Sequence, residues 1–420
     1  MDGDGMNKLA INGGPRAIPY ELPAVENSSG RFFGEQELAL VTEVMKSGRL
    51  NYLAGGGKVA EFERNFGGVF GATYAVATSC GTAAIHAAVI ALDLDPGSEV
   101  IVAPITDMGT IIPILMQQLI PVFADVDPAT CNVTAKSIAE KITDRTKAII
   151  VVHMFGHPCE MGPIVELARK HKLFLIEDCC QAFLTKNNGK ICGTFGDLGC
   201  FSFQQSKHMT TGDGGMVISN NDALGKRMRL AMDKGWPREG QFRDHLFLAP
   251  AYHMTELQAA VGIAQLKKLH AIVEARRENA RNMLPLIRNI SGVTGPVEHL
   301  WATHTYWKYP IRVDLSFFSA DLQTIADALK AEGIQSWAGY TKVPIYQYDV
   351  LTVPRTFGKS GWPISGITGR KYSYGPGLCP IAEKVLTEMI VLPWNEKYTE
   401  THLRDLATGL AKVFEHYRKR

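Results

Sequence analysis

A lysine and an aspartate stand at the ends of two strand-like runs, and their side chains could act together on one cofactor. Lys207 follows the apolar run Phe201–Phe203 and precedes the glycine-rich stretch Gly212–Gly215. Asp178 ends the run Phe174–Asp178. A lysine amine can form a Schiff base with the aldehyde of pyridoxal 5'-phosphate (PLP), and a carboxylate keeps the pyridine nitrogen protonated so that the ring accepts electrons. An isolated lysine is usually a solvated surface residue, but the flanking residues favour a catalytic role for Lys207.

Further polar residues near these two positions could bind the rest of such a cofactor. Gly81 and Thr82 lie where a strand-like run gives way to a helix, and free backbone N–H groups at such a turn attract a phosphate. Ser202 lies five residues before Lys207 and could offer a hydroxyl to the same phosphate. Gln181 lies three residues after Asp178 and could reach the ring hydroxyl. Taken singly, an ordinary helix cap and a polar residue at a helix start would explain the Gly81–Thr82 turn and Gln181 equally well.

The pattern of strand-like and helical segments around these residues predicts an α/β fold. Residues 74 to about 220 alternate between strand-like runs and amphipathic helices, which predicts a parallel sheet with helices on both faces. The run Lys147–Val152 is nearly all apolar, as in a strand buried on both faces. A strongly helical segment then leads to a smaller α+β part. We therefore predict a large cofactor-binding domain with an N-terminal arm at residues 1–265, and a smaller C-terminal domain at residues 266–420.

Composition narrows the class of protein. A chain of 420 residues is longer than one core normally supports, which agrees with two domains. Lys and Arg number 44 against 42 Asp and Glu, so neither a nucleic-acid partner nor a membrane surface is expected. None of the eight cysteines forms a C-x-x-C pair, and their spacing to histidines predicts no metal site. Free cysteines and the absence of a signal-like N-terminus predict a cytoplasmic protein.

Several segments, in the same order and at the same spacing, resemble the DegT/StrS-type sugar aminotransferases. The resemblance runs from about Asn51 to the C-terminus, and its strongest parts are Ile176–Ala182 and Cys200–Gly215. It implies the aspartate-aminotransferase fold (PLP fold type I), with a mainly parallel seven-stranded sheet and a smaller C-terminal domain. It also implies a homodimer whose subunits share their active sites.

The resemblance assigns a role to each site residue. Lys207 takes the place of the Schiff-base lysine, and Asp178 that of the partner of the pyridine nitrogen. Gln181 would bind the ring oxygen, while Ser202 and the Gly81–Thr82 turn would hold the phosphate.

Two departures from the family pattern concern the cofactor. Asp107 falls where the family usually places an aromatic residue on the ring face, so we expect Met108 or another side chain to cover the cofactor there. Ala251 replaces an Asn that reaches the phosphate of the neighbouring subunit, and His253 replaces an Arg. These changes put the cross-subunit phosphate contact in doubt but remove none of the chemistry.

The resemblance predicts an aminotransferase that moves an amino group from glutamate or glutamine to a keto-sugar, nucleotide-linked or not, or to a keto-cyclitol. Such steps belong to antibiotic and other secondary-metabolite pathways or to surface-glycan synthesis. Two alternatives stay open. One is a PLP-dependent dehydratase or aromatising enzyme of the same superfamily, and the other is a cofactor-free regulatory protein on this fold.

Residues 354–379 form a long segment rich in Gly, Pro, Ser and aromatic side chains. A loop of that length within a compact domain is usually functional or mobile. We interpret it as a loop that covers the substrate, with a plain surface excursion as the alternative.

Overall fold

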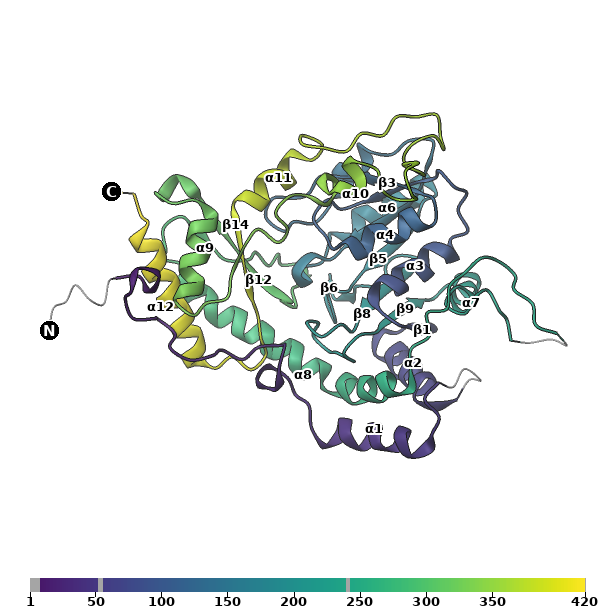
Figure 1. Cartoon of the computed structure of the whole chain (residues 1–420), viewed down its shortest axis with the longest axis horizontal. Helices are drawn as coiled ribbons and strands as arrows, with labels where there is room; N and C mark the ends of the chain where they lie inside the picture. Colours follow the sequence, from purple (N-terminus) through teal and green to yellow (C-terminus); the bar gives the residue numbers. More distant parts are fainter. Residues whose placement is uncertain (1–7, 52–55, 239–241, 420) are drawn as a thin grey trace.

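A seven-stranded sheet organises the larger part of the protein in the computed structural model, which describes residues 8–51, 56–238 and 242–419 (Figure 1). Its strand order is β1-β9-β8-β5-β4-β2-β3. All pairings are parallel except those of β9, which runs antiparallel to both β1 and β8. The strands are β1 (Tyr74–Thr78), β2 (Glu99–Val102), β3 (Ile120–Phe123), β4 (Thr146–Val152), β5 (Phe174–Asp178), β8 (Leu198–Ser202) and β9 (Gly215–Ser219). The predicted mainly parallel, seven-stranded α/β fold is confirmed.

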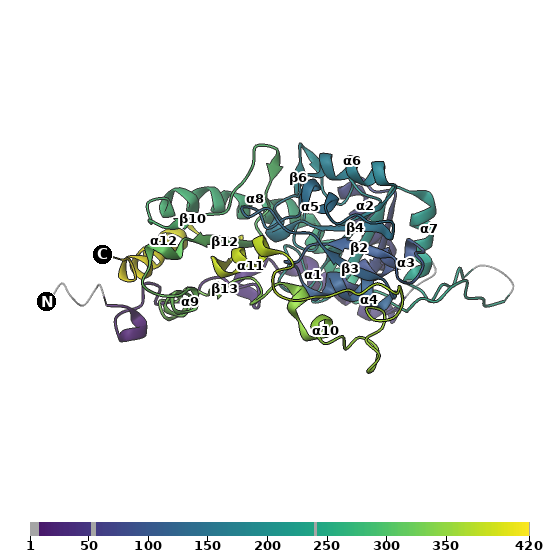
Figure 2. The same ribbon diagram turned by 90° about the horizontal axis from the view of Figure 1, so that it is seen from above.

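Helices cover both faces of this sheet because its central strands are apolar on both sides. In the second view α6 lies on one side of β4 and β2, and α4 lies on the other (Figure 2). The helices that follow the strands are α3 (Gly81–Ala91), α4 (Met108–Met116), α5 (Ala135–Ala139), α6 (Met161–His171) and α7 (Asp222–Ala231). Burial of Ile149, Ile150 and Val151 is complete, which explains the unbroken apolar run in the sequence.

A four-stranded antiparallel sheet, in the order β10-β12-β14-β13, forms the second core. It packs against α9 (Leu322–Ala331) and α12 (Glu400–His416). Its strands are β10 (Val293–Thr294), β12 (Lys308–Val313), β13 (Trp337–Ala338) and β14 (Met389–Pro393). The smaller elements are β6 (Lys186–Asn187), β7 (Lys190–Ile191), β11 (Ala302–Thr303), α10 (Asp349–Thr352), α11 (Pro380–Thr387) and five 3-10 helices (Ala10–Asn12, Ser28–Gly30, Met154–Gly156, Leu315–Phe317 and Ile345–Gln347).

One long helix, α8 (Glu256–Ile287), joins the two cores. It packs against α1 (Glu35–Ser47) and α2 (Gly57–Phe70), and also against α12 of the smaller part. The expected domain boundary at residue 265 falls inside this continuous helix, and the division into two domains stays a prediction. In the described ranges no helix has the length and apolar character needed to cross a membrane.

The N-terminal arm, residues 8–34, runs along the smaller core before it reaches α1 (Figure 1). Asn395, which follows β14, donates a hydrogen bond of 3.2 Å from its Nδ2 to the carbonyl of Gly30. A Cβ on Gly30 would lie 2.4 Å from that Nδ2 atom, so the arm can approach this closely only with a glycine. The arm is therefore an integral part of the fold.

The segment 354–379 follows the outer edge of the large sheet. The Tyr374 hydroxyl donates to the carbonyl of Pro121 on edge strand β3 at 2.8 Å, and the Tyr372 hydroxyl donates to Glu99 at the start of β2 at 2.8 Å. These contacts lie on the edge strand and at the amino ends of strands, whereas Asp178 ends β5 at the opposite end of the sheet. Within the chain these contacts hold the segment away from the carboxyl edge. Its interpretation as a loop that covers the substrate stays a prediction, with a plain surface excursion as the alternative. The segment shields an otherwise open sheet edge.

Candidate cofactor and catalytic site

The carboxyl edge of the large sheet brings together residues from three strand ends. Asp178 ends β5, Ser202 ends the neighbouring β8, and Gly81 begins α3 just after β1. A Cβ placed on Gly81 would lie 2.6 Å from the Ser202 Cβ and 3.2 Å from the Cys180 Sγ. The glycine thus lets the Ser202 side chain lie directly against the first turn of α3, where a hydroxyl and the free N–H groups of a helix start suit an anion.

Lys207 lies in the turn after β8, and its amine faces an aromatic ring. Its Nζ is 4.2 Å from the ring centroid of Trp307 and makes no hydrogen bond or ion pair with any residue that the structure describes. Desolvation lowers the pKa of Lys207, while Cys180, Asp178 and Asp107 act in the opposite direction. A desolvated lysine amine is the form that attacks a carbonyl and removes protons.

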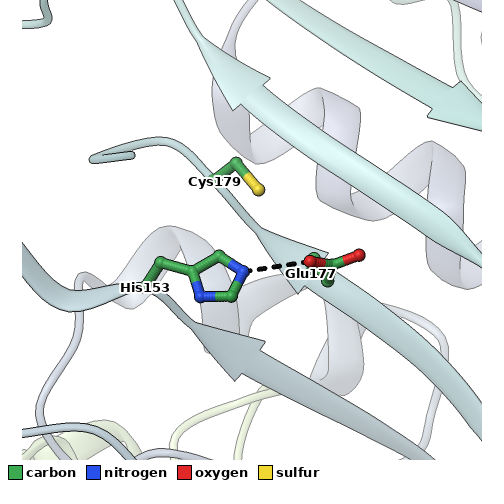
Figure 3. Close-up of side chains that lie close together, drawn as sticks. All are labelled: His153, Glu177 and Cys179. Atoms are coloured by element: carbon green, nitrogen blue, oxygen red, sulfur yellow. Dashed lines mark hydrogen bonds and ion pairs between the residues drawn. The ribbon is translucent and has the colours of Figure 1, made fainter. Parts of the chain in front are cut away.

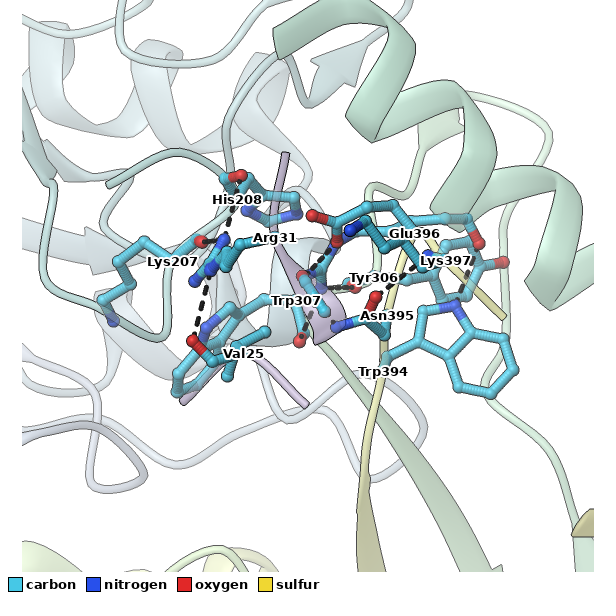
Figure 4. Close-up of polar contacts among 12 residues, drawn as sticks. Val25, Arg31, Lys207, His208, Tyr306, Trp307, Trp394, Asn395, Glu396 and Lys397 are labelled. Atoms are coloured by element: carbon cyan, nitrogen blue, oxygen red, sulfur yellow. Dashed lines mark hydrogen bonds and ion pairs between the residues drawn. The ribbon is translucent and has the colours of Figure 1, made fainter. Parts of the chain in front are cut away.

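The backbone around Lys207 is held by Arg31 of the N-terminal arm (Figure 4). The buried Arg31 guanidinium donates to the carbonyls of Lys207 at 2.7 Å and His208 at 3.4 Å, and also to that of Gln205. Burial lowers the pKa of Arg31 to about 10. Trp307 adds a hydrogen bond of 2.8 Å from its indole Nε1 to the carbonyl of Ser206. A reactive side chain on such a tied backbone has little freedom to leave its position.

Asp178 is buried but keeps hydrogen-bonding capacity. Its Oδ1 accepts from the Cys180 backbone N–H at 3.0 Å, and its Oδ2 accepts from the Thr110 hydroxyl at 2.8 Å. An ionised carboxylate can accept about four hydrogen bonds, so Asp178 can accept another from a ring N–H.

Gln181 contacts Tyr340, which lies in the segment after β13. Its Oε1 accepts from the Phe155 backbone N–H at 2.9 Å, and its Nε2 donates to the Tyr340 hydroxyl at 3.2 Å. Phe155 has a φ of 57°, a left-handed conformation that turns this N–H toward the glutamine. Desolvation raises the pKa of Tyr340, which therefore stays a neutral hydroxyl near neutral pH.

Thr82, Asp107 and Met108 lie near one another at the start of α4. Asp107 caps this helix by accepting from the Gly109 N–H at 2.7 Å. A Cβ on Gly109 would lie 2.6 Å from the Thr82 Oγ1 and 2.9 Å from the Asp107 Oδ1, so these two polar groups flank Gly109. Asp107 is exposed and Met108 is partly buried. Cover of the cofactor by Met108 stays a prediction.

The two substituted positions of the second departure find partners within the chain. His253 Nε2 lies 2.8 Å from Asp233 Oδ1, and Ala251 forms a β-bridge with the same Asp233. The His253 side chain is thus already paired with an acid of its own chain.

Four residues of this region were not found from the sequence: Arg31, Thr110, Trp307 and Tyr340. Each approaches from a segment remote in the chain from the residue it contacts. Only Thr110 carried a signal, because it lies in the same segment as Asp107.

Next to this site lies a second cluster of titratable groups, His153, Glu177 and Cys179 (Figure 3). One Glu177 oxygen accepts from the Phe195 and Gly196 N–H groups at 2.7 and 2.8 Å. The other accepts from the Gly193 N–H at 2.8 Å and lies 3.1 Å from His153 Nε2. The acid therefore holds the loop before β8 in place.

Comparison with known proteins agrees with the geometry. The profile of the DegT/DnrJ/EryC1/StrS aminotransferase family matches residues 32–411. A GDP-perosamine synthase from Caulobacter vibrioides is 36% identical over 75% of this chain and 84% of its own length. A putative L-glutamine:3-amino-2,3-dideoxy-scyllo-inosose aminotransferase from Streptoalloteichus tenebrarius is 30% identical over 85% of each chain.

The solved structure of an aminotransferase from Psychrobacter cryohalolentis superposes with a TM-score of 0.81, at 29% identity, over 92% of this chain and 98% of that chain. The fold is that of PLP fold type I, and the sequence relatives include sugar and aminocyclitol aminotransferases. The chain is an aminotransferase and belongs to the DegT/DnrJ/EryC1/StrS family.

Proposed function

We propose that this protein is a PLP-dependent aminotransferase that transfers an amino group from glutamate or glutamine to a keto-sugar or keto-cyclitol. The observation that carries the proposal is the desolvated Lys207 amine, which is left without a polar partner beside the buried Asp178. A buried ammonium without a counter-ion costs stability, and such groups cluster where they do chemistry.

The residues present fit PLP. The turn at Gly81, with the Ser202 hydroxyl and the start of α3, would hold the phosphate. The remaining acceptor capacity of Asp178 would bind the protonated ring nitrogen, and the Gln181 amide would bind the ring hydroxyl. When bound, PLP supplies an aldehyde carbon that takes the amino nitrogen and a ring that takes up the electrons of the broken bond.

Lys207 would carry two steps with one atom. Its Nζ would first hold the cofactor covalently, and the amine of the donor would displace it. The freed Nζ would then remove the α-proton of the donor, with the proton residing on that nitrogen until it is returned to the cofactor. The bonds from Arg31 and Trp307 to carbonyls of this turn would keep Nζ within reach throughout.

The acceptor class rests on the relatives, whose names cover a nucleotide-linked sugar and an aminocyclitol. Lysine at position 207 favours transamination over dehydration, because dehydrating members of the superfamily commonly carry histidine at this position. The adjacent His208 is buried with its Nε2 2.8 Å from the Thr305 carbonyl, so it is engaged elsewhere. We also propose a homodimer with shared active sites, which light scattering after gel filtration would test.

The deciding experiment is a visible absorption spectrum of the purified protein with PLP, before and after addition of glutamine or glutamate. We expect a yellow band that shifts on addition of a donor, and that borohydride fixes to a peptide containing Lys207. Keto-sugars and keto-cyclitols would then be screened as acceptors. A band that no amino donor moves would favour elimination chemistry, and a protein that never takes up PLP would overturn the proposal.

A further inference from the structure

A cavity of about 580 Å³ lies between the N-terminal arm and the four-stranded sheet. Arm residues 20–27 line one side, and Trp307, Lys308 and Trp337 line the other. Ser206 also borders it, so the cavity adjoins the Lys207 turn without including Lys207. Nothing in the proposed amino transfer uses this space.

Lys308 is the one lysine of this cavity whose ammonium lacks an ionic partner in the described ranges. Its Nζ lies 5.3 Å from the ring centroid of Trp307 and 4.9 Å from that of Trp337, and it makes no hydrogen bond or ion pair there. The other lysine of the cavity, Lys330, is paired with Asp327 Oδ1 at 3.0 Å. Burial lowers the pKa of Lys308 to about 8, against the attraction of Glu26. The attraction of the ammonium to two indole rings offsets only part of the free energy lost when it is desolvated.

The charges around the cavity restrict which ligand Lys308 could bind. Besides Lys308, the lining holds the positive charges of Arg16 and of Lys330, which is paired with Asp327, and the negative charges of Glu21 and Glu26. A doubly charged phosphate would be repelled by both acids, whereas a singly charged carboxylate could pair with Lys308 and keep its apolar part against the indole rings. The exposed carboxamide of Gln335 also lines the cavity and can donate to a carboxylate oxygen.

We propose that this cavity binds a small organic monocarboxylate, whose carboxylate pairs with Lys308 between the rings of Trp307 and Trp337. The site is separate from the one at which amino transfer is proposed, and it does not depend on that chemistry. Because Trp307 contributes to both, occupation of the cavity would be sensed next to Lys207.

Binding can be followed by the fluorescence of the two indoles in the full-length protein, with butyrate as the probe. Lys308→Met keeps the aliphatic stem and removes the charge, and Lys330→Met is a matched control within the same cavity. We expect saturable quenching in the wild type, about tenfold weaker binding in Lys308→Met because one charge-assisted hydrogen bond is lost, and binding within about twofold in Lys330→Met. Equal affinity in the wild type and Lys308→Met would overturn the proposal.

Three further arms separate the competing explanations. Butyrate should still bind to Lys207→Ala, and loss of binding there but not in Lys308→Met would place the anion at the catalytic lysine and overturn the proposal. Butylammonium should not bind, and inorganic phosphate should bind more weakly than butyrate. Tighter binding of either would refute the monocarboxylate class.

Thermal unfolding distinguishes binding from a merely structural role. Without ligand, Lys308→Met should unfold at the same or a higher temperature than the wild type, because an unpaired, partly buried charge is removed. Butyrate should raise the unfolding temperature of the wild type only. A lower unfolding temperature for Lys308→Met, with no effect of butyrate on either protein, would assign Lys308 to packing alone.

Discussion

Glu177 and Asp178 are consecutive residues of β5, and their buried carboxylates have very different surroundings. Glu177 accepts three backbone N–H groups and contacts His153, which uses its hydrogen-bonding capacity fully. Asp178 accepts one backbone N–H and one hydroxyl. Because successive side chains of a strand point to opposite faces, one acid holds a loop and the other reaches the carboxyl edge.

The same contrast separates the two clusters as a whole. His153, Glu177 and Cys179 look like a metal site by composition, yet both ring nitrogens of His153 and both carboxylate oxygens of Glu177 already have hydrogen-bond partners within the fold. The Lys207 amine, by contrast, makes no hydrogen bond or ion pair with any described residue and has an aromatic ring as its neighbour. Saturated buried groups stabilise a structure, whereas buried groups with unused capacity are where chemistry is to be sought.

Replacement of Lys207 by Ala tests the contrast with the largest effect. We expect the turnover rate to fall by about a thousandfold, because both the covalent anchor and the general base are lost. Unfolding should occur at the same or higher temperature, since no hydrogen bond of the side chain is removed. Steady-state kinetics measure the turnover rate, and calorimetry measures the unfolding temperature. A fully active variant would exclude Lys207 as the base.

Glu177→Gln should reverse this pattern. An amide nitrogen cannot accept a hydrogen bond, so at least one buried backbone N–H loses its partner, and we expect a loss of about 3 kcal/mol in the free energy of unfolding. Asp178→Asn is the matched control on the neighbouring residue. Its amide can donate to the Thr110 hydroxyl, so stability should change by less than about 1 kcal/mol while activity falls. Urea denaturation of both variants measures the two losses. Equal losses of stability would show that the two carboxylates do not differ in their structural role.

The sequence was sufficient for the part of the site that lies on strand ends. Asp178, Ser202 and the Gly81 turn follow apolar runs, and parallel strands bring such ends to one edge. The roles of these residues stay predictions, but their convergence did follow from the pattern.

The rest could not be found in the same way because it depends on packing between distant segments. Arg31 and Trp307 donate hydrogen bonds to carbonyls of the Lys207 turn from segments far before and far after it in the sequence. No pattern in the sequence indicates these contacts. The contacts of segment 354–379 with the sheet edge could not be foreseen either, because its glycines and aromatics indicate a long loop but not the strands along which it lies.

Acid should destabilise the fold at buried His86, whose two ring nitrogens already have hydrogen-bond partners. His86 Nδ1 lies 2.8 Å from the Tyr252 hydroxyl and its Nε2 lies 2.8 Å from the Gln117 amide, and burial lowers its pKa to about 4. Between the unfolded value near 6.5 and about 4 the unfolded state binds more protons, so stability falls as the pH falls through this window.

From pH 6.5 to about 5 this single group should cost about 1.5 kcal/mol. His86→Gln can keep both hydrogen bonds without titrating, and its loss of stability over this interval should be smaller by that amount. Urea denaturation at the two pH values gives the difference. An identical pH dependence in the variant would show that the pKa of His86 is the same in the folded and the unfolded protein.

The smallest effect is expected for metal ions at the His153–Glu177–Cys179 cluster. His153 Nδ1 accepts from the Cys159 N–H at 3.0 Å, so its proton lies on Nε2 and points at Glu177, which leaves neither nitrogen free for a metal. Burial, with Glu177 nearby, raises the pKa of the Cys179 thiol well above its usual value, so the thiolate that zinc requires is not formed. Neither added Zn²⁺ nor a chelator should shift the unfolding temperature, which differential scanning calorimetry would measure. Stoichiometric zinc that is lost on substitution of Cys179 would contradict this view, because a cluster saturated by its own fold has no ligand to offer.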